Sequence, residues 1–335
     1  MKSTFTYLII LTSCLLSCNK TTNGDGRYSF YYWKTSVSLT KNETDLLTNV
    51  RTIYVRYFDI KWDKKPIPVA KVDFTNFSFK NTSITPVIYI KNEVFTNISE
   101  KEIRDLSNRT LELLDKINTI IGIKSNKEIQ IDCDWSDETK SKYFDFLKNL
   151  KEKYEHTISV TIRLHQIKYY SKTGIPPCDK GVLMFYNMGK LGNLDRNSIY
   201  NNYDASQYVK YVKNYPLFLD VALPIFRWGY VLRNRRIINL LSKIDDEELK
   251  RQIFIKQIDK QHFQFLEGMY WKGIYFQKND EIVIEKITQK ELFHAANLLS
   301  KYIKHPSNTI FFDLDSANIS HFSHEEFFQV SSLFR

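Results

Sequence analysis

Short apolar runs alternate with amphipathic segments along most of this chain. Runs of about four to eight residues that are rich in β-branched and aromatic side chains predict strands, and apolar residues three and four apart predict helices. The predicted strands span residues 29–33, 52–59, 85–90, 128–134, 158–165, 181–186, 218–224 and 309–314. Strands that alternate with helices are typical of βα units and a parallel sheet.

Two of the predicted helices have a recognisable start. Ser99 is followed by Glu102, and Thr288 by Glu291, and both pairs match a capping box ahead of an apolar face. Eight strands with intervening helices in 335 residues predict an α/β fold, a (β/α)₈ TIM-like barrel. An open doubly wound sheet is the alternative, and it is disfavoured because no glycine-rich phosphate turn follows a predicted strand.

One segment exceeds what the barrel needs. Residues from about 245 to 286 contain a charged helical stretch, followed by an alternating pattern at 270–286 around Lys278-Asn279-Asp280. We therefore expect a helix-plus-hairpin insertion between the seventh and eighth strands. Nothing else in 28–335 marks a second domain, so a single barrel domain is expected.

The first residues have the pattern of an export signal. Lys2 precedes an apolar run at 5–16 that is too short to cross a bilayer. The run ends in Leu15-Leu16-Ser17-Cys18, which resembles the lipobox of bacterial lipoproteins. We expect residues 1–17 to be removed as a signal peptide, Cys18 to be lipidated, and 18–27 to form a flexible tether. The chain would then be anchored in the bacterial cell envelope, at the outer membrane; an ordinary secretory signal is the alternative.

Charge and cysteine content narrow the range of partners. The sequence has 48 Lys and Arg against 38 Asp and Glu, a net charge of +10, with the basic residues scattered among acidic ones. Nucleic acid is therefore not an expected partner. We expect Cys133 and Cys178 to be free thiols, with a disulfide as the alternative. His321 and His324 are expected at the surface, and no metal or cofactor is indicated.

Two carboxylates close the predicted strand 128–134. Side chains alternate along a strand, so Gln130, Asp132 and Asp134 share one side while Ile129 and Ile131 share the other. Carboxylates on an apolar strand are costly unless they are paired, hydrogen-bonded or hydrated. Active sites of barrels lie at the carboxyl ends of the strands, so these acids mark a candidate site.

Other strand ends supply the partners that a sugar needs. Sugars offer apolar C–H faces that stack on aromatic rings, and hydroxyls that require fixed polar partners. The residues expected to bind a substrate are Trp33, Trp62, Trp135, Arg163, His165, Tyr186, Asn187, Asp220 and Trp228. The alternative for the tryptophans is packing at the rim of the barrel, and for His165 a hydrogen-bonded role in the scaffold.

Three segments resemble the family-18 glycoside hydrolases. Ile131-Asp132-Cys133-Asp134-Trp135 matches part of that family's fourth-strand motif D-x-x-D-x-D-x-E, and Met184-Phe185-Tyr186-Asn187 is similar to its sixth-strand element. The segment 223–229 (LPIFRWG) is similar to its seventh-strand L-P-x-Y-G. As a whole the chain resembles a group of uncharacterised bacterial lipoproteins with this set of motifs. The resemblance implies a (β/α)₈ barrel that handles carbohydrate.

The departures from the family motif are chemically decisive. The catalytic acid of the family would fall at position 136, where this chain has Ser136, and the first aspartate of the motif is replaced by Ile129. A serine hydroxyl cannot protonate a glycosidic oxygen at neutral pH. We expect Ser136 to be the N-cap of the following helix instead, and the family's mechanism cannot be transferred.

These observations leave three functional hypotheses. In the first, the barrel is a membrane-anchored glycoside hydrolase in which Glu93 donates the proton, Asp134 is its partner and Asp132 tunes Asp134. Such pairs lie roughly 5–5.5 or 6.5–9.5 Å apart; Glu93 could equally pair with Arg163 or Lys91. In the second, the barrel binds glycans without turnover. In the third, it is a structural envelope lipoprotein that contacts another protein.

Overall fold

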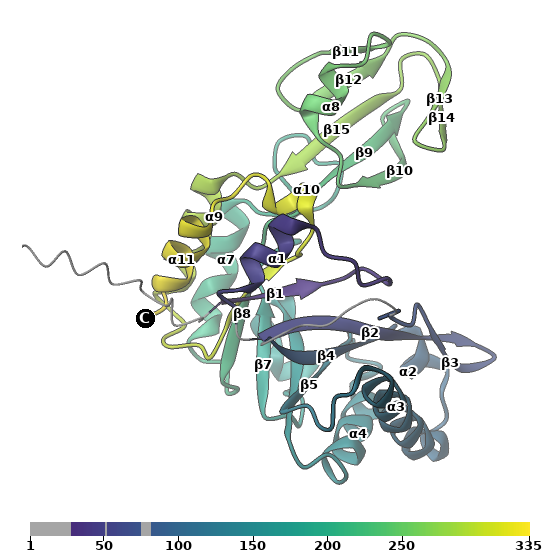
Figure 1. Cartoon of the computed structure of the whole chain (residues 1–335), viewed down its shortest axis with the longest axis vertical. Coiled ribbons are helices and arrows are strands. Elements are labelled where there is room, and N and C mark those ends of the chain that lie inside the picture. The colour runs from purple at the N-terminus through teal and green to yellow at the C-terminus, as the bar shows by residue number, and fades with distance from the viewer. Residues whose placement is uncertain (1–27, 51, 75–81) are drawn as a thin grey trace, which may run out of the picture.

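The computed structural model describes residues 28–50, 52–74 and 82–335. The predicted signal peptide (1–17), Cys18 and the predicted tether (18–27) lie outside the described residues. Within the described part of the chain, eight parallel strands close into a barrel in the order β1-β16-β8-β7-β6-β5-β4-β2, and β2 pairs with β1 to complete the ring (Figure 1). The barrel strands are β1 (Tyr28–Tyr32), β2 (Thr52–Asp63), β4 (Ser83–Ile90), β5 (Glu128–Asp132), β6 (Thr157–Arg163), β7 (Lys180–Met184), β8 (Leu219–Pro224) and β16 (Thr309–Phe312). The predicted (β/α)₈ fold and all eight predicted strands are confirmed.

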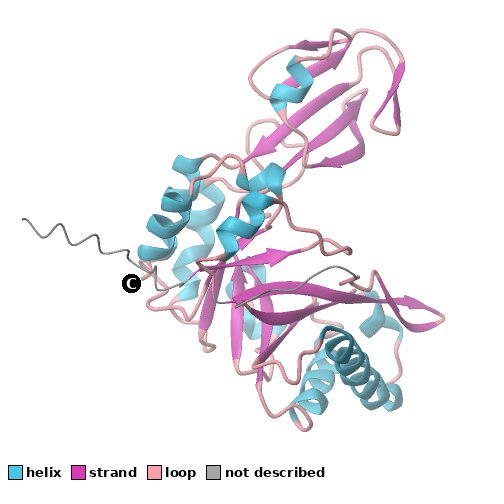
Figure 2. Cartoon of the chain, viewed as in Figure 1, coloured by secondary structure: helices cyan, strands magenta, loops and turns pink. Residues whose placement is uncertain are grey.

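Helices cover the outside of the barrel (Figure 2). They are α1 (Lys41–Leu47), α2 (Glu93–Asn97), α3 (Glu100–Ile121), α4 (Lys140–Lys151), α5 (Leu164–Lys168), α6 (Tyr170–Thr173), α7 (Asn202–Val212), α9 (Gln289–Leu299), α10 (Ser316–Ile319) and α11 (His324–Ser332). The capping boxes at Ser99 and Thr288 begin α3 and α9 as expected. α3 ends at Gly122, whose φ of 74° lies in the left-handed region that glycine adopts without strain. Between β2 and β4 the described residues form no helix; instead, β2 turns back into the antiparallel strand β3 (Lys65–Val69).

The barrel interior is polar and hydrogen-bonded. The Tyr31 hydroxyl on β1 donates to the Gln130 side chain on β5 at 2.6 Å. Because β1 and β5 are not neighbours in the sheet, this bond crosses the interior. Toward the amino ends of the strands, Lys180 lies 2.8 Å from Glu128 and 2.7 Å from Asp220. The apolar residues on the other side of β5, Ile129 and Ile131, are buried in the core under the helices.

The extra segment between β8 and α9 forms a protruding unit of strands. It consists of β9 (Arg227–Arg233), β10 (Arg236–Ser242), α8 (Asp246–Lys250), β11 (Ile255–Gln257), β12 (His262–Phe265), β13 (Met269–Trp271), β14 (Ile274–Phe276) and β15 (Glu281–Lys286). Five of its strands form an antiparallel sheet in the order β10-β9-β15-β12-β11, and this sheet has its own apolar cluster. We call this unit, residues 227–286, the insertion.

The insertion differs from its prediction in two respects. It begins at Arg227, directly after β8, rather than near 245. The expected hairpin around Lys278-Asn279-Asp280 is also absent from the described strands, because β15 pairs with β9 and β12. The hairpin lies earlier, where β13 and β14 turn at Lys272 and Gly273, both with positive φ. Two successive positive φ values define the tight turn that favours glycine and matches the twist of a hairpin.

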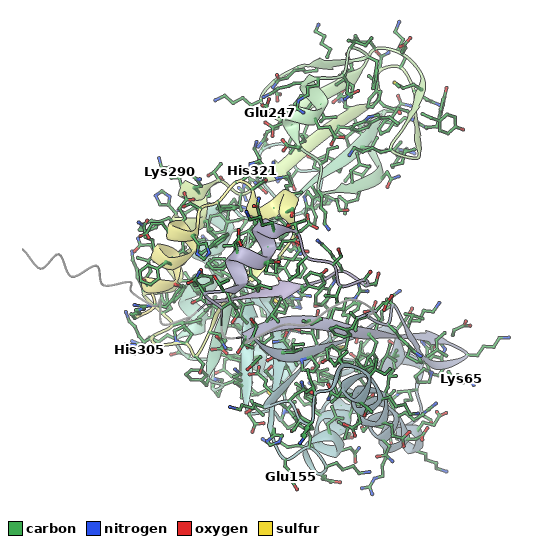
Figure 3. All side chains as sticks on the ribbon, viewed as in Figure 1. Lys65, Glu155, Glu247, Lys290, His305 and His321 are labelled. Carbon is green, nitrogen blue, oxygen red and sulfur yellow. The ribbon has the colours of Figure 1, made fainter. Side chains whose placement is uncertain are left out.

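The two ends of the barrel can be located in Figure 3. Glu155 and His305 precede β6 and β16 and mark the amino end of the strands, whereas His321 and Glu247 lie on the side of the insertion. The described part of the chain contains no helix whose length and hydropathy would suit a membrane crossing. Cys133 is buried, Cys178 is partly buried, and both are free thiols.

Candidate functional site

Two adjoining cavities open at the carboxyl end of the barrel. The larger, which we call the mouth cavity, has a volume of about 510 Å³, and the smaller, the side cavity, about 470 Å³. Arg163, Tyr186 and Asn187 line both of them. These residues follow or end β6 and β7, so the two cavities meet above those strands.

Aromatic rings form much of the wall of the mouth cavity. They come from segments far apart in the sequence: Trp33, Tyr89, Tyr186, Phe226, Trp228 and Phe312. Phe312 is central to this group, because its ring lies 5.5 Å from Trp33, 5.6 Å from Tyr186 and 5.7 Å from Phe226 between centroids. Such contacts hold each ring in a fixed orientation, which a stacking surface for a ligand requires.

Arg163 organises the two acids of the β5 motif. Its Nε donates to Asp134, and its Nη2 lies 3.7 Å from Asp132. Burial opposes the charge of Arg163, but the two carboxylates outweigh that effect and raise its pKa. The guanidinium is therefore a fixed positive charge between the two cavities.

Asp132 and Asp134 lie in different surroundings. Asp132 is buried at the end of β5 and accepts a hydrogen bond from the Thr161 hydroxyl at 2.6 Å. Burial raises the pKa of Asp132, an effect that Arg163 opposes and Asp134 reinforces. The Asp134 side chain is 50% exposed and lines the side cavity. Both acids are thus held by Arg163, yet each borders an open cavity rather than a closed surface.

A further acid, Asp313, lines the mouth cavity directly after β16. Its residue exposure is only 6%. Burial raises the pKa of Asp313 to about 6, with the nearby carboxylate of Asp315 acting in the same direction and Lys243 and Lys34 opposing it. The amide of Asn318 donates to Asp313 Oδ1 at 2.5 Å.

Six of the predicted substrate-binding residues lie at the two cavities. Trp33 and Trp228 line the mouth cavity, His165 lines the side cavity, and Arg163, Tyr186 and Asn187 line both. Burial lowers the pKa of His165, with Arg163 acting in the same direction against Asp134. The remaining three, Trp62, Trp135 and Asp220, are not among the residues that line either cavity.

Trp135 and Asp220 have structural surroundings instead. Trp135 packs on Tyr143 of α4 with centroids 5.2 Å apart, and its indole N–H donates to the Thr173 carbonyl at 2.9 Å. It turns away from the barrel because it follows the end of β5, where strict alternation no longer applies. Asp220 is the second residue of β8, so it lies at the amino end of the barrel, in an ion pair with Lys180. Neither position allows contact with a ligand in the mouth cavity.

Glu93 and Trp62 are hydrogen-bonded neighbours that lie outside the mouth and side cavities. The Glu93 carboxylate accepts a hydrogen bond from the Trp62 backbone N–H at 3.4 Å, and Glu93 begins α2. Glu93 is exposed and does not line the mouth or the side cavity. Its pairing with Asp134 stays a prediction.

Ser136 has a different role from the expected one. α4 begins at Lys140 with Thr139 as its N-cap. Ser136 lies one turn earlier, where its backbone N–H donates to the Thr139 hydroxyl at 2.9 Å and its carbonyl accepts from Lys140 at 3.0 Å. Residue 136 lines neither cavity. The position at which the family-18 motif has its catalytic acid therefore has a structural role in this chain, in the turn before α4.

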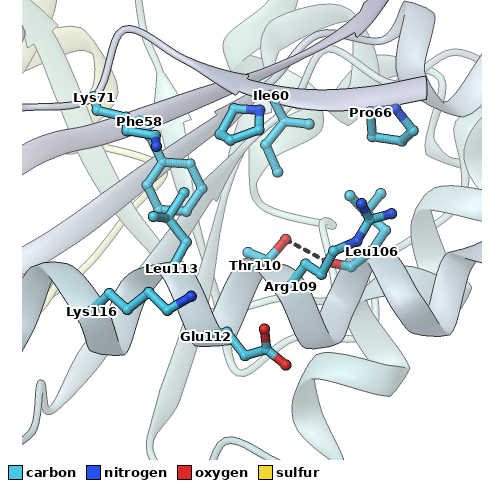
Figure 4. A pocket seen from close by; sticks show the side chains of 11 residues that line it. Phe58, Ile60, Pro66, Lys71, Leu106, Arg109, Thr110, Glu112, Leu113 and Lys116 are labelled. Carbon is cyan, nitrogen blue, oxygen red and sulfur yellow. Dashed lines mark hydrogen bonds between the residues drawn. The ribbon is translucent and has the colours of Figure 1, made fainter. Parts of the chain in front are cut away.

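A third cavity lies elsewhere, between α3 and the β2–β3 hairpin, with a volume of about 260 Å³ (Figure 4). Phe58, Ile60 and Pro66 form its strand side, and Leu106 and Leu113 its helix side. None of the predicted site residues lines it. In the described ranges, no cluster of three or more His, Cys, Asp or Glu side chains could hold a metal ion.

Several residues of the mouth cavity were not among the predicted ones. They are Lys34, Arg56, Tyr89, Met184, Phe226, Arg227, Leu240, Ser242, Lys243, Phe312, Asp313 and Asn318. Phe226 follows the predicted strand 218–224, and Phe312 and Asp313 lie near the end of the predicted strand 309–314, which was a usable signal. Leu240, Ser242 and Lys243 belong to β10 or follow it, and nothing in their local pattern places the insertion beside the barrel.

The fold has counterparts among solved structures. The spore cortex-lytic enzyme SleL of Bacillus cereus superimposes with a TM-score of 0.56 and 14% sequence identity, over 92% of this chain and 74% of SleL. The chain has the barrel fold of the family-18 glycoside hydrolase type. A chitinase from Chromobacterium violaceum matches with a TM-score of 0.52 and 11% identity, over 92% of this chain and 98% of the chitinase.

The sequence comparisons add no further relative. No protein-family model matches the sequence, and no curated protein matches it either. The likeness to family-18-type barrels therefore rests on the course of the chain, at identities that carry no residue roles across.

Proposed function

We propose that the chain is a saccharide-binding barrel whose ligand occupies the mouth cavity. The observation that carries the proposal is the convergence of aromatic rings from β1, β4, β7, β8–β9 and β16 on one cavity of about 510 Å³. Polar groups that suit sugar hydroxyls lie among these rings: Arg163, Asn187, Asp313 and Asn318. Sugar recognition needs this combination of flat apolar surfaces and fixed hydrogen-bonding groups.

The structural neighbours support a glycan as the ligand. SleL is named as a spore cortex-lytic enzyme, and the Chromobacterium protein as a chitinase, a name that describes action on the polysaccharide chitin. A glycoside-hydrolase-like activity on polysaccharide or glycoconjugate is the finer form of the proposal. It requires a proton donor other than residue 136, because Ser136 lies outside both cavities.

A glycan-array screen of residues 28–335 tests the proposal. Trp33→Ala and Trp228→Ala should weaken binding about tenfold each, which corresponds to about 1.4 kcal/mol of lost ring contact. Tyr270→Ala is the matched control, because Tyr270 is an exposed aromatic residue of the insertion that does not line the mouth cavity. If no glycan binds, or if the control weakens binding as much as the two tryptophan variants, the proposal is wrong.

We also propose that acyl chains on Cys18 hold the barrel on a membrane. Each buried methylene contributes roughly 0.8 kcal/mol, so several chains on one cysteine give firm attachment. The test compares detergent-phase partitioning of the full chain with that of Cys18→Ser. Equal partitioning of the two into the aqueous phase would refute lipidation and favour an ordinary secretory signal.

A second candidate function is a contact with another envelope protein. Ile237, Ile238 and Leu240 are exposed on β10, which is an edge strand of the insertion sheet. Exposed apolar edge strands invite pairing with another chain. A photo-cross-linking residue at position 238 should give a discrete adduct in cells, whereas the same residue at the exposed Ile120 on α3 should not.

A further inference from the structure

Asp313 differs from the other acids around the barrel mouth. Asp134 is paired with Arg163, Asp59 with Arg56, and Asp315 with both Lys34 and Lys243. Among the described residues, no cation lies within ion-pair distance of Asp313. Asp313 is also the one of these four that lines the mouth cavity itself.

The hydrogen bonds of Asp313 define which oxygen is available. Its Oδ1 accepts the amide N–H of Asn318, a residue that is fully buried at the wall of the same cavity. Because Oδ1 already accepts this hydrogen bond, we place the proton of the Asp313 carboxyl group on Oδ2. The Oδ1 atom of Asn318 is buried without a donor from the described part of the chain. A ligand hydroxyl in the cavity would satisfy it.

Burial outweighs the charges that face Asp313, so its pKa is raised. Lys34 follows β1, Lys243 follows β10, and Asp315 precedes α10, while the buried Tyr186 hydroxyl lies after β7. Burial is the largest effect and raises the pKa to about 6, and the two lysines only partly oppose it. A carboxylic acid in an apolar wall with a raised pKa has the property that a general acid needs.

We propose that Asp313 is the proton donor for cleavage of a glycosidic bond in the mouth cavity, in place of the acid missing at position 136. This inference rests on the proposed saccharide site. The proton on Oδ2 passes to the glycosidic oxygen as the bond to the anomeric carbon breaks, and that oxygen keeps the electron pair. A water molecule from the open cavity then adds to the anomeric carbon and releases its proton to solvent. One water is consumed, two hydroxyl groups form, and solvent exchange returns the proton to Asp313.

Asp313→Asn is the direct test, since it keeps the size of the side chain and removes the acid. On a glycan that binds, product formation should fall about 10²- to 10⁴-fold, with binding retained. Asp145→Asn makes the same chemical change on the exposed surface of α4 and should leave turnover unchanged. Retained binding also shows that the variant is folded.

The pH profile separates a catalytic role from a structural one. In the wild type, kcat/KM should fall as the pH rises through about 6, because the donor must be protonated. The Asp313→Asn variant should lose this limb along with most of its rate.

Three results are distinguishable. If the wild type binds glycans but releases no product, or if Asp313→Asn keeps wild-type turnover, the acid role is refuted while the saccharide site stands. If nothing binds, the proposed function fails as well. Turnover that is lost in the variant together with the limb near pH 6 supports the proposal.

Discussion

The buried charges at the amino end of the barrel give a prediction that can be worked out from the structure. Lys180 lies between Asp220 and Glu128, with N–O distances of 2.7 and 2.8 Å. Its side chain is 11% exposed, that of Asp220 is fully buried, and that of Glu128 is 13% exposed. Lys180→Met would keep the approximate volume of the side chain and remove its charge, which leaves the carboxylates of Asp220 and Glu128 without a cation.

Removing one partner of a buried ion pair costs about 3–5 kcal/mol, because the remaining charge is uncompensated. With a urea m-value near about 3 kcal/mol/M, a loss of about 4 kcal/mol lowers the unfolding midpoint by about 1.3 M. Burial opposes the charge of Lys180, but Asp220 and Glu128 outweigh it and raise its pKa above the ordinary 10.5. A cation with a raised pKa contributes its full stabilisation below the ordinary value, so the loss should be complete at pH 7.

The assay is urea unfolding followed by circular dichroism at pH 7. Lys148→Met is the control, because Lys148 pairs with Asp145 on the exposed surface, where such pairs contribute about 0–1 kcal/mol. If Lys180→Met loses no more stability than this control, the inference that Lys180 stabilises the buried carboxylates of Asp220 and Glu128 is wrong.

Three further predictions concern single side chains. Burial raises the pKa of Asp313 from 3.8 to about 6, so the folded protein holds this proton more tightly than the unfolded chain. Wild-type stability should therefore fall by up to about 3 kcal/mol as the pH rises from about 3 to about 7, and urea unfolding of Asp313→Asn should show a flatter dependence. Trp135→Phe removes the bond to the Thr173 carbonyl and should cost about 1–3 kcal/mol of stability in thermal unfolding; weaker glycan binding at unchanged fold would contradict the placement of Trp135. Tyr31→Phe breaks the bond to Gln130 across the barrel and should cost a similar amount, and no change in the unfolding midpoint would count against a packed polar interior.

The local pattern of the sequence determined the barrel. Period-two apolar runs and capping boxes depend on neighbouring residues only, so all eight strands and the starts of α3 and α9 were predictable. The strand ends also identified Trp33, Asp132, Asp134, Arg163 and Tyr186, because parallel strands bring their carboxyl ends to one edge.

Only the tertiary structure decided which strand-end residues meet. We predicted Asp220 as a site residue because it borders the predicted strand 218–224. It is the second residue of β8, however, and therefore lies at the opposite end of the barrel. The Trp135 side chain packs in the helix layer, where its ring contacts Tyr143 and its indole N–H donates to the Thr173 carbonyl. Both outcomes depend on contacts with residues distant in sequence, which periodicity does not encode.

The raised pKa of Asp313 could not be predicted from the sequence either. Its position after an apolar strand was visible, yet its protonation depends on burial beside Asn318 and on Lys34 and Lys243, which come from the first strand and from the insertion. A pKa is set by the charges and the solvent that surround a group in space. The sequence by itself therefore determined the barrel and the edge at which its site lies, and only the tertiary structure decided which carboxyl groups at that edge are buried and have a raised pKa.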